Sequence, residues 1–153
     1  MIRGVVLCCA IYFLSLSLPL VKSMTDEQKA MIHEHFEKVG LECLKGNMIT
    51  EDDIKNLRAR KVPEGENAPC FLACMFRSIG IIDDKGLMQK ENALELAKTV
   101  FKDPEELKMI ADYIHSCSHI NSDAVSDGEK GCDRSINAYK CMVENGKQFG
   151  FDV

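Results

Sequence analysis

Two cysteines four positions apart, Cys70 and Cys74, constrain the fold of this chain more than any other feature of its sequence. The residues between them are apolar, and an α-helix places residues four apart on one face, with about 5–6 Å between their Cβ atoms. A disulfide needs a Cβ separation of about 3.8 Å. The two cysteines therefore do not pair with each other, and a helix that carries them would be fastened to two other parts of the chain.

The first 23 residues have the form of a secretory signal peptide. A basic residue near the start precedes an apolar run over residues 5–20, and small residues before a polar segment place the cleavage site after Ser23. A transmembrane anchor is the alternative, but the run is short for a span of about 20 residues and contains Pro19. We expect residues 1–23 to be removed and residues 24–153 to form one secreted domain.

Removal of that segment leaves six cysteines, which in a short secreted chain predict three disulfides. A zinc site is the alternative, but only one gap between the cysteines is as short as zinc-binding pairs require. The chain also loses two of its 19 basic residues and keeps all 24 acidic ones, so its net charge is near −7. This charge argues against nucleic acid or an anionic membrane as a partner. The six cysteines are Cys43, Cys70, Cys74, Cys117, Cys132 and Cys141.

Apolar residues at helical spacing, together with helix-capping signals, predict an all-α fold with about six helices. Thr25 and Gln28 form the pattern of a capping box at the start of the first helix. Asp103 followed by Pro104 marks the start of the fifth. No segment alternates apolar and polar residues long enough to suggest a strand. The expected helices cover residues 25–45, 50–60, 68–79, 87–101, 103–117 and 132–144.

The gaps between the six cysteines, 26, 3, 42, 14 and 8 residues, have a recognisable pattern. Together with a signal peptide and an all-α chain of this length, they resemble the insect odorant-binding proteins, the six-cysteine family that includes pheromone-binding and general odorant-binding proteins. The resemblance covers residues 25–153. It implies the pairs Cys43–Cys74, Cys70–Cys132 and Cys117–Cys141, each of which would stabilise the fold by roughly 2–4 kcal/mol.

The resemblance implies a carrier whose helices surround an apolar cavity for a small hydrophobic ligand, such as an odorant or a pheromone-like volatile. The many methionines of the chain suit a surface that adapts to several ligands. We expect the ligand contacts among the inward apolar residues, although each of these could instead fill the core: Phe36, Leu72, Phe76, Ile79, Leu87, Met88, Leu94, Ile110, Ala111, Ile114 and Met142.

The C-terminal tail carries two further candidates, Phe149 and Phe151, which flank a glycine. They could fold over the mouth of the cavity as a short lid. A frayed tail exposed to solvent is the alternative.

The sequence contains no activated nucleophile, metal triad or paired carboxylates with an evident task, so we expect neither an enzyme nor a metal site nor a cofactor. The expected location is outside the cell, in sensory lymph or another body fluid. A membrane odorant receptor is a possible partner beside the ligand, and the chain is expected to be a monomer or a weak homodimer. Two other functions stay open: a carrier that works outside smell, in haemolymph or secretions, and a disulfide-stapled module that binds a protein.

Overall fold

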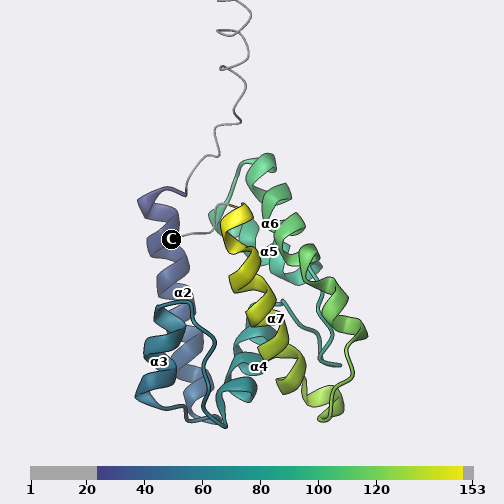
Figure 1. Ribbon diagram of the computed structural model, residues 1–153. Coiled ribbons are helices and arrows are strands. Elements are labelled where there is room, and N and C mark those ends of the chain that lie inside the picture. The colour runs from purple at the N-terminus through teal and green to yellow at the C-terminus, as the bar shows by residue number, and fades with distance from the viewer. Residues whose placement is uncertain (1–23, 150–153) are drawn as a thin grey trace, which may run out of the picture.

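A computed structural model describes residues 24–149, and this part of the protein is built from helices (Figure 1). An isolated bridge between Ile82 and Met88 is the one β pairing in the described range. The predicted all-α class with about six helices is confirmed. The predicted signal peptide, residues 1–23, and Phe151 lie outside the described residues. The elements are α2 (Asp26–Leu44), α3 (Glu51–Arg58), α4 (Ala68–Ser78), α5 (Glu91–Val100), α6 (Pro104–Ser116), η1 (Ser118–Ser122), η2 (Gly128–Lys130), α7 (Cys132–Asn145) and η3 (Gly146–Phe149).

Three helices begin where the sequence signals predict. Thr25 forms a complete capping box with Gln28 at the start of α2, because each side chain bonds the backbone N–H of the other residue. At the start of α6 the Asp103 carboxylate accepts a hydrogen bond from the N–H of Glu105, at 2.9 Å. Thr50 begins α3 with a capping box of the same kind as the one at Thr25. These caps satisfy backbone donors that have no partner within the helix.

The start of α5 differs from the prediction, which placed it at residue 87, whereas the helix begins at Glu91. The cause is the side chain of Asn121, far along the chain. Its Oδ1 accepts a bond from the N–H of Met88 at 2.7 Å, and its Nδ2 donates to the carbonyl of Met88 at 3.0 Å. Met88 also forms the isolated bridge with Ile82. This backbone is bound in an extended form and cannot join the helix.

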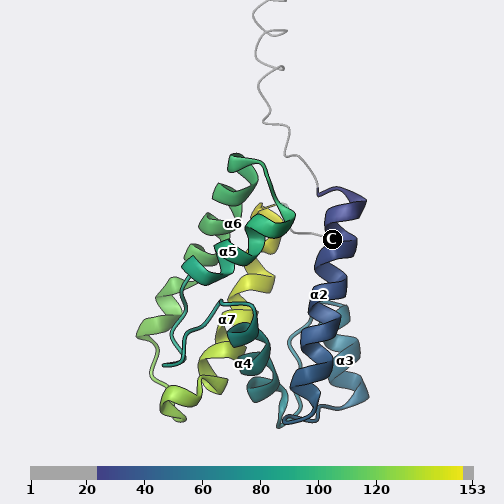
Figure 2. The same ribbon diagram turned by 180° about the vertical axis from the view of Figure 1, so that it is seen from behind.

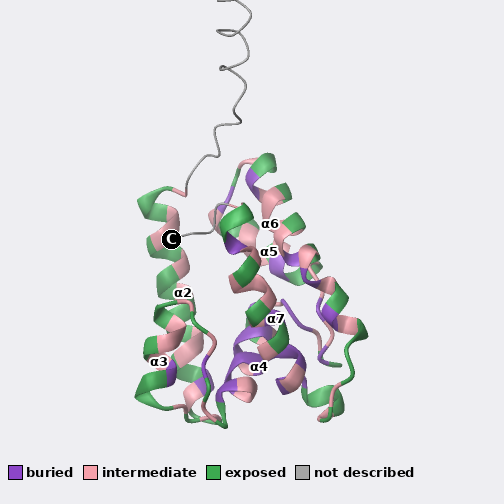
Figure 3. Ribbon diagram, viewed as in Figure 1, coloured by how far each residue is buried: buried purple, intermediate pink, exposed green. Residues whose placement is uncertain are grey.

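Helix α4 lies between α2 and α7 in the lower part of the molecule as drawn (Figure 1 and Figure 2). It packs against α7 and α2, while α5 packs against α6. Figure 3 shows α4 as largely buried, whereas α2 and α3 are mostly exposed or half-buried. Because α4 is apolar on nearly all sides, it has a neighbour on most of them. Its buried side chains are Ala68, Phe71, Leu72, Ala73, Met75 and Phe76.

Two disulfides fasten neighbouring helices to α4, and a third joins α6 to α7. Cys43–Cys74 joins the end of α2 to α4, and Cys70–Cys132 joins α4 to the first residue of α7. Cys117–Cys141 joins the end of α6 to α7. These are the pairs that the family resemblance implied. Cys70 and Cys74 thus connect α4 to two different helices.

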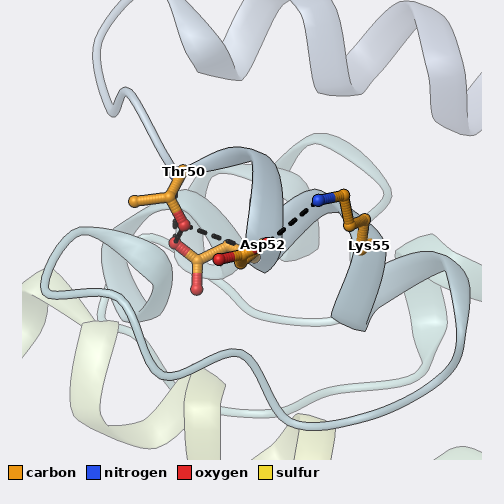
Figure 4. Close-up of polar contacts among 4 residues, drawn as sticks. Thr50, Asp52 and Lys55 are labelled. Carbon is orange, nitrogen blue, oxygen red and sulfur yellow. Dashed lines mark hydrogen bonds and ion pairs between the residues drawn. The ribbon is translucent and has the colours of Figure 1, made fainter.

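The carboxylate of Asp53 fixes both α3 and the loop that leads to α4. It accepts hydrogen bonds from the Thr50 hydroxyl at 2.7 Å, from the Thr50 N–H at 3.0 Å and from the Gly65 N–H at 2.8 Å. The side chain is 3% exposed. The Thr50 hydroxyl, helped by the Gly65 N–H and opposed by burial, holds the pKa of Asp53 below its ordinary value of 3.8. By contrast, the neighbouring Asp52 pairs with Lys55 in solvent (Figure 4).

We expect Asp53→Asn to lower the free energy of unfolding by about 1–3 kcal/mol at neutral pH, because a buried charged acceptor of several hydrogen bonds is lost. Since folding lowers the pKa of Asp53, its contribution is complete above the ordinary value of 3.8 and disappears as the pH falls through the folded pKa. Urea unfolding of both proteins from neutral to strongly acidic pH measures this. Asp52→Asn is the matched control and should change stability by less than about 0.5 kcal/mol. An equal effect of both substitutions would contradict the assignment.

A second prediction concerns the link between Asn121 and Met88. Asn121→Ala removes both hydrogen bonds to the backbone of a residue that is 6% exposed. The free energy of unfolding should fall by about 1–2 kcal/mol, as expected when buried backbone groups lose their partners. Ser122→Ala, at the exposed next position, serves as the control in the same urea titration. Unchanged stability of the Asn121 variant would show that the link does not hold residues 87–90 in place.

Candidate ligand-binding cavity

A cavity of about 1110 Å³ lies beside α4. Small-molecule sites in proteins commonly measure about 300–1,000 Å³, so this one can enclose a small hydrophobic molecule. Helix α4 and the residues that follow it form the floor, and side chains from α2, α3 and α7 form the walls. The apolar lining consists of Met24, Ala30, Ile32, Phe36, Leu57, Ala59, Phe71, Leu72, Met75, Phe76, Ile79, Ile81, Met142 and Val143.

The floor of the cavity is its most deeply buried part. Phe71, Leu72, Met75, Phe76 and Ile79 are each at most 9% exposed. They come from one helix and its C-cap, so one rigid element presents them together. The walls are more open, since Phe36 on α2 is 41% exposed. The cavity therefore has a closed apolar floor and a side that reaches solvent.

Two tyrosines supply neutral polar groups. The Tyr113 hydroxyl, on α6, donates to the carbonyl of Met142 at 2.8 Å. Burial raises the pKa of Tyr113 to about 12, although the positive charge of Arg60 acts in the opposite direction. Burial also raises the pKa of Tyr139, on α7, and Arg60 again opposes it. Both phenols therefore stay protonated at neutral pH, and the positive charge of Arg60 partly offsets the rise in the pKa of each.

The charged side chains of the lining come from elements other than α4. Lys29 lies on α2, Arg58 at the end of α3, Arg60 directly beyond it, and Lys147 on η3. Lys29 and Arg60 are half-buried, while Arg58 and Lys147 are exposed. The lining also includes His33 and Gly146.

Arg60 occupies a position that usually belongs to glycine. Its φ is 54°, the left-handed region, and it is the one described residue other than glycine with a positive φ. The N–H of Arg60 bonds the carbonyl of Leu57 at 3.1 Å, and the N–H of Lys61 bonds that of Asn56 at 2.8 Å. These two bonds form the Schellman ending of α3, whose left-handed residue is most often glycine. An arginine there costs roughly 1–2 kcal/mol in backbone energy.

Five of the residues expected to touch ligand line this cavity, and they are Phe36, Leu72, Phe76, Ile79 and Met142. Ile114 and Met88 are buried in the main hydrophobic core, and Ile110 packs against it. The ring of Phe149 packs against that of Tyr113, with 5.5 Å between their centres. Those four residues, together with Leu87, Leu94 and Ala111, are not among the lining residues. Phe151 lies outside the described residues.

Several lining residues were not predicted from the sequence. Phe71 and Met75 belong to the predicted apolar helix, so that signal was available. Ile32 lies four residues before Phe36 on the predicted apolar stripe of the first helix. The basic lining residues are not part of any apolar helix face, so hydrophobic periodicity does not predict them.

Within residues 24–149 no three His, Cys, Asp or Glu side chains are grouped so that they could hold a metal ion. None of the helices described there is long and apolar enough to cross a membrane.

Comparisons with known structures give the same fold. An odorant-binding protein of Drosophila melanogaster, dmelOBP28a, superposes with a TM-score of 0.59 at 23% identity, covering 82% of this chain and 99% of that one. A pheromone-binding protein of the cockroach Leucophaea maderae, solved in complex with the fluorescent reporter ANS, gives a TM-score of 0.55 at 24% identity. That match covers 81% of this chain and 98% of the cockroach chain. At these identities the likeness shows the fold.

Sequence comparisons extend the likeness to the family. General odorant-binding protein 19d of Drosophila melanogaster is 28% identical over 121 residues, which cover 78% of this chain and 77% of the relative. General odorant-binding protein 69a of the same species is 32% identical over 119 residues, 76% of this chain and 72% of the relative. The sequence pattern of the PBP/GOBP family matches residues 25–145. The chain therefore belongs to the PBP/GOBP family, whose members are odorant- and pheromone-binding proteins.

Proposed function

We propose that this protein is an extracellular carrier that binds a small hydrophobic molecule, such as an odorant, in the cavity beside α4. The observation that carries the proposal is the hollow itself, about 1110 Å³ with an apolar floor, in a chain of the PBP/GOBP family. In the same proposal residues 1–23 are a signal peptide and residues 24–153 are one domain secreted into sensory lymph or another body fluid. The protein binds and releases its ligand without changing it chemically.

Affinity in such a site comes from removing apolar surface from water. Each methylene group that leaves water contributes about 0.8 kcal/mol. A medium-length alkyl chain therefore gains several kcal/mol, part of which offsets the loss of translational and rotational freedom on binding. The floor is preformed because α4 is held by two disulfides, so little ordering is needed on that side. Wall residues such as Met142 have flexible side chains that can adapt to ligands of different shape.

We assign the ligand contacts to the five expected residues that line the cavity, Phe36, Leu72, Phe76, Ile79 and Met142. Delivery to a membrane odorant receptor, by a monomer or a weak homodimer, belongs to the same proposal. Expression in antennae or in other tissues separates a carrier in smell from one with another task.

Because the chain contains no tryptophan, a single introduced tryptophan reports on its own surroundings. We expect Met142→Trp, whose side chain would lie at the cavity wall, to change its emission saturably when 1-decanol is added. Leu41→Trp is the control, since Leu41 is 61% exposed on α2 and does not line the cavity. Its emission should not change.

The unmodified protein should also take up the neutral dye N-phenyl-1-naphthylamine with a rise in dye fluorescence, and 1-decanol should displace the dye. Absence of dye uptake by a folded protein would end the carrier proposal. An equal response of both tryptophans would place the ligand outside the cavity.

A further inference from the structure

The charged side chains that line the cavity have one sign. Among the described lining residues Lys29, Arg58, Arg60 and Lys147 are cationic at neutral pH, and none is Asp or Glu. The whole chain has the opposite bias, with 24 acidic against 19 basic residues. If the charged lining residues had the same composition as the whole chain, acidic residues would be expected among them. The cationic lining is therefore a local feature of the cavity.

The cations lie apart from the apolar floor. They come from α2, the end of α3, the residue beyond it and η3, whereas the floor comes from α4. Arg58 and Lys147 are exposed, and every floor residue of α4 is buried. The side chains of Lys29, Arg58 and Lys147 form no ion pair with another described residue. The more exposed part of the lining, called the opening below, thus carries the cations together with exposed apolar side chains such as that of Phe36, whereas the α4 floor is buried and apolar.

Arg60 adds a second observation. The chain keeps an arginine at the left-handed position that ends α3, where glycine avoids the backbone cost. Arg60 lines the same cavity as Tyr113 and Tyr139, and its positive charge opposes the rise in the pKa of both phenols. The cavity wall therefore carries a cation at position 60 although the left-handed backbone there is unfavourable for arginine.

We propose that the cavity selects amphiphilic ligands with an apolar body and an anionic headgroup, and that the headgroup is a carboxylate, as in a medium- or long-chain fatty acid. The inference rests on the proposed carrier function and names its ligand class. A carboxylate on the floor would lose its hydration without a counter-charge, at a large cost. At the opening it stays partly hydrated and meets cations, while the alkyl chain fills the apolar part. Arginine and lysine are the side chains that bind carboxylates through charge-assisted hydrogen bonds.

The test compares decanoate with 1-decanol, which have the same alkyl chain and differ in headgroup charge. Each displaces N-phenyl-1-naphthylamine from the full mature chain at neutral pH. Decanoate should bind about tenfold more tightly than 1-decanol, the size expected of a few partly exposed charge contacts. Arg58→Gln/Lys147→Gln should remove most of this preference, because it should weaken the binding of decanoate far more than the binding of 1-decanol.

The matched control is Lys45→Gln/Lys98→Gln, which removes the same charge from two exposed lysines that pair with Glu42 and Glu95 and do not line the cavity. It should keep the full preference for decanoate. Arg60→Gly is a second variant, and it should lower the ratio of decanoate to 1-decanol affinity. Since 1-decanol binding reports that each variant is folded, a misfolded variant is recognised directly.

Equal affinity of the unmodified protein for both ligands would overturn the headgroup assignment and leave the carrier function standing. The assignment also fails when the cavity and control variants weaken decanoate equally, because net charge would then be the cause. No uptake of the neutral dye by the unmodified protein would instead refute the carrier function on which the inference depends.

Discussion

The fixed position of α4 is the constraint on which the rest of the structure depends. Cys74 ties it to α2 and Cys70 ties it to α7, so helices on two sides of the cavity are bound covalently to the helix that forms its floor. A large hollow costs stability, because the side chains around it lose packing partners. Each disulfide offsets roughly 2–4 kcal/mol of that cost by restricting the unfolded chain. The walls can thus stay apart without collapsing onto the floor.

The sequence predicts the helices well where local chemistry decides them. The caps at Thr25, Thr50 and Asp103 act within one turn of the chain, and all three helix starts are where they indicate. The start of α5 is missed because Asn121, far away in sequence, binds the backbone of Met88. A hydrogen bond between segments far apart in the chain leaves no periodic pattern of apolar residues from which it could be predicted. The disulfide pairing likewise came from the family resemblance, since cysteine spacing alone leaves it open.

Prediction of the site is limited by a different physical fact. Hydrophobic periodicity shows which face of a helix points inward, but an inward face can meet either a packed core or a hollow. Leu72 and Phe76 of α4 line the cavity because a helix that is apolar nearly all round has neighbours on most sides, one of which is the cavity. Phe71 and Met75 of the same helix also line it but were not predicted to do so. Ile114 also points inward, yet it meets the core. Only the three-dimensional arrangement separates these two outcomes.

The division of the lining explains how one fold could serve many ligands. The floor residues of α4 are fixed by packing and by two disulfides, and in the proposed carrier they would supply affinity that depends on apolar area more than on ligand identity. Arg58 and Lys147, at the opening, are exposed, and the fold does not depend on their side chains. Substitutions there can change the preferred headgroup without loss of stability. We therefore expect selectivity for the headgroup to depend on the exposed lining residues, whose side chains folding constrains least. Arg60 is the exception, because its backbone is part of the ending of α3.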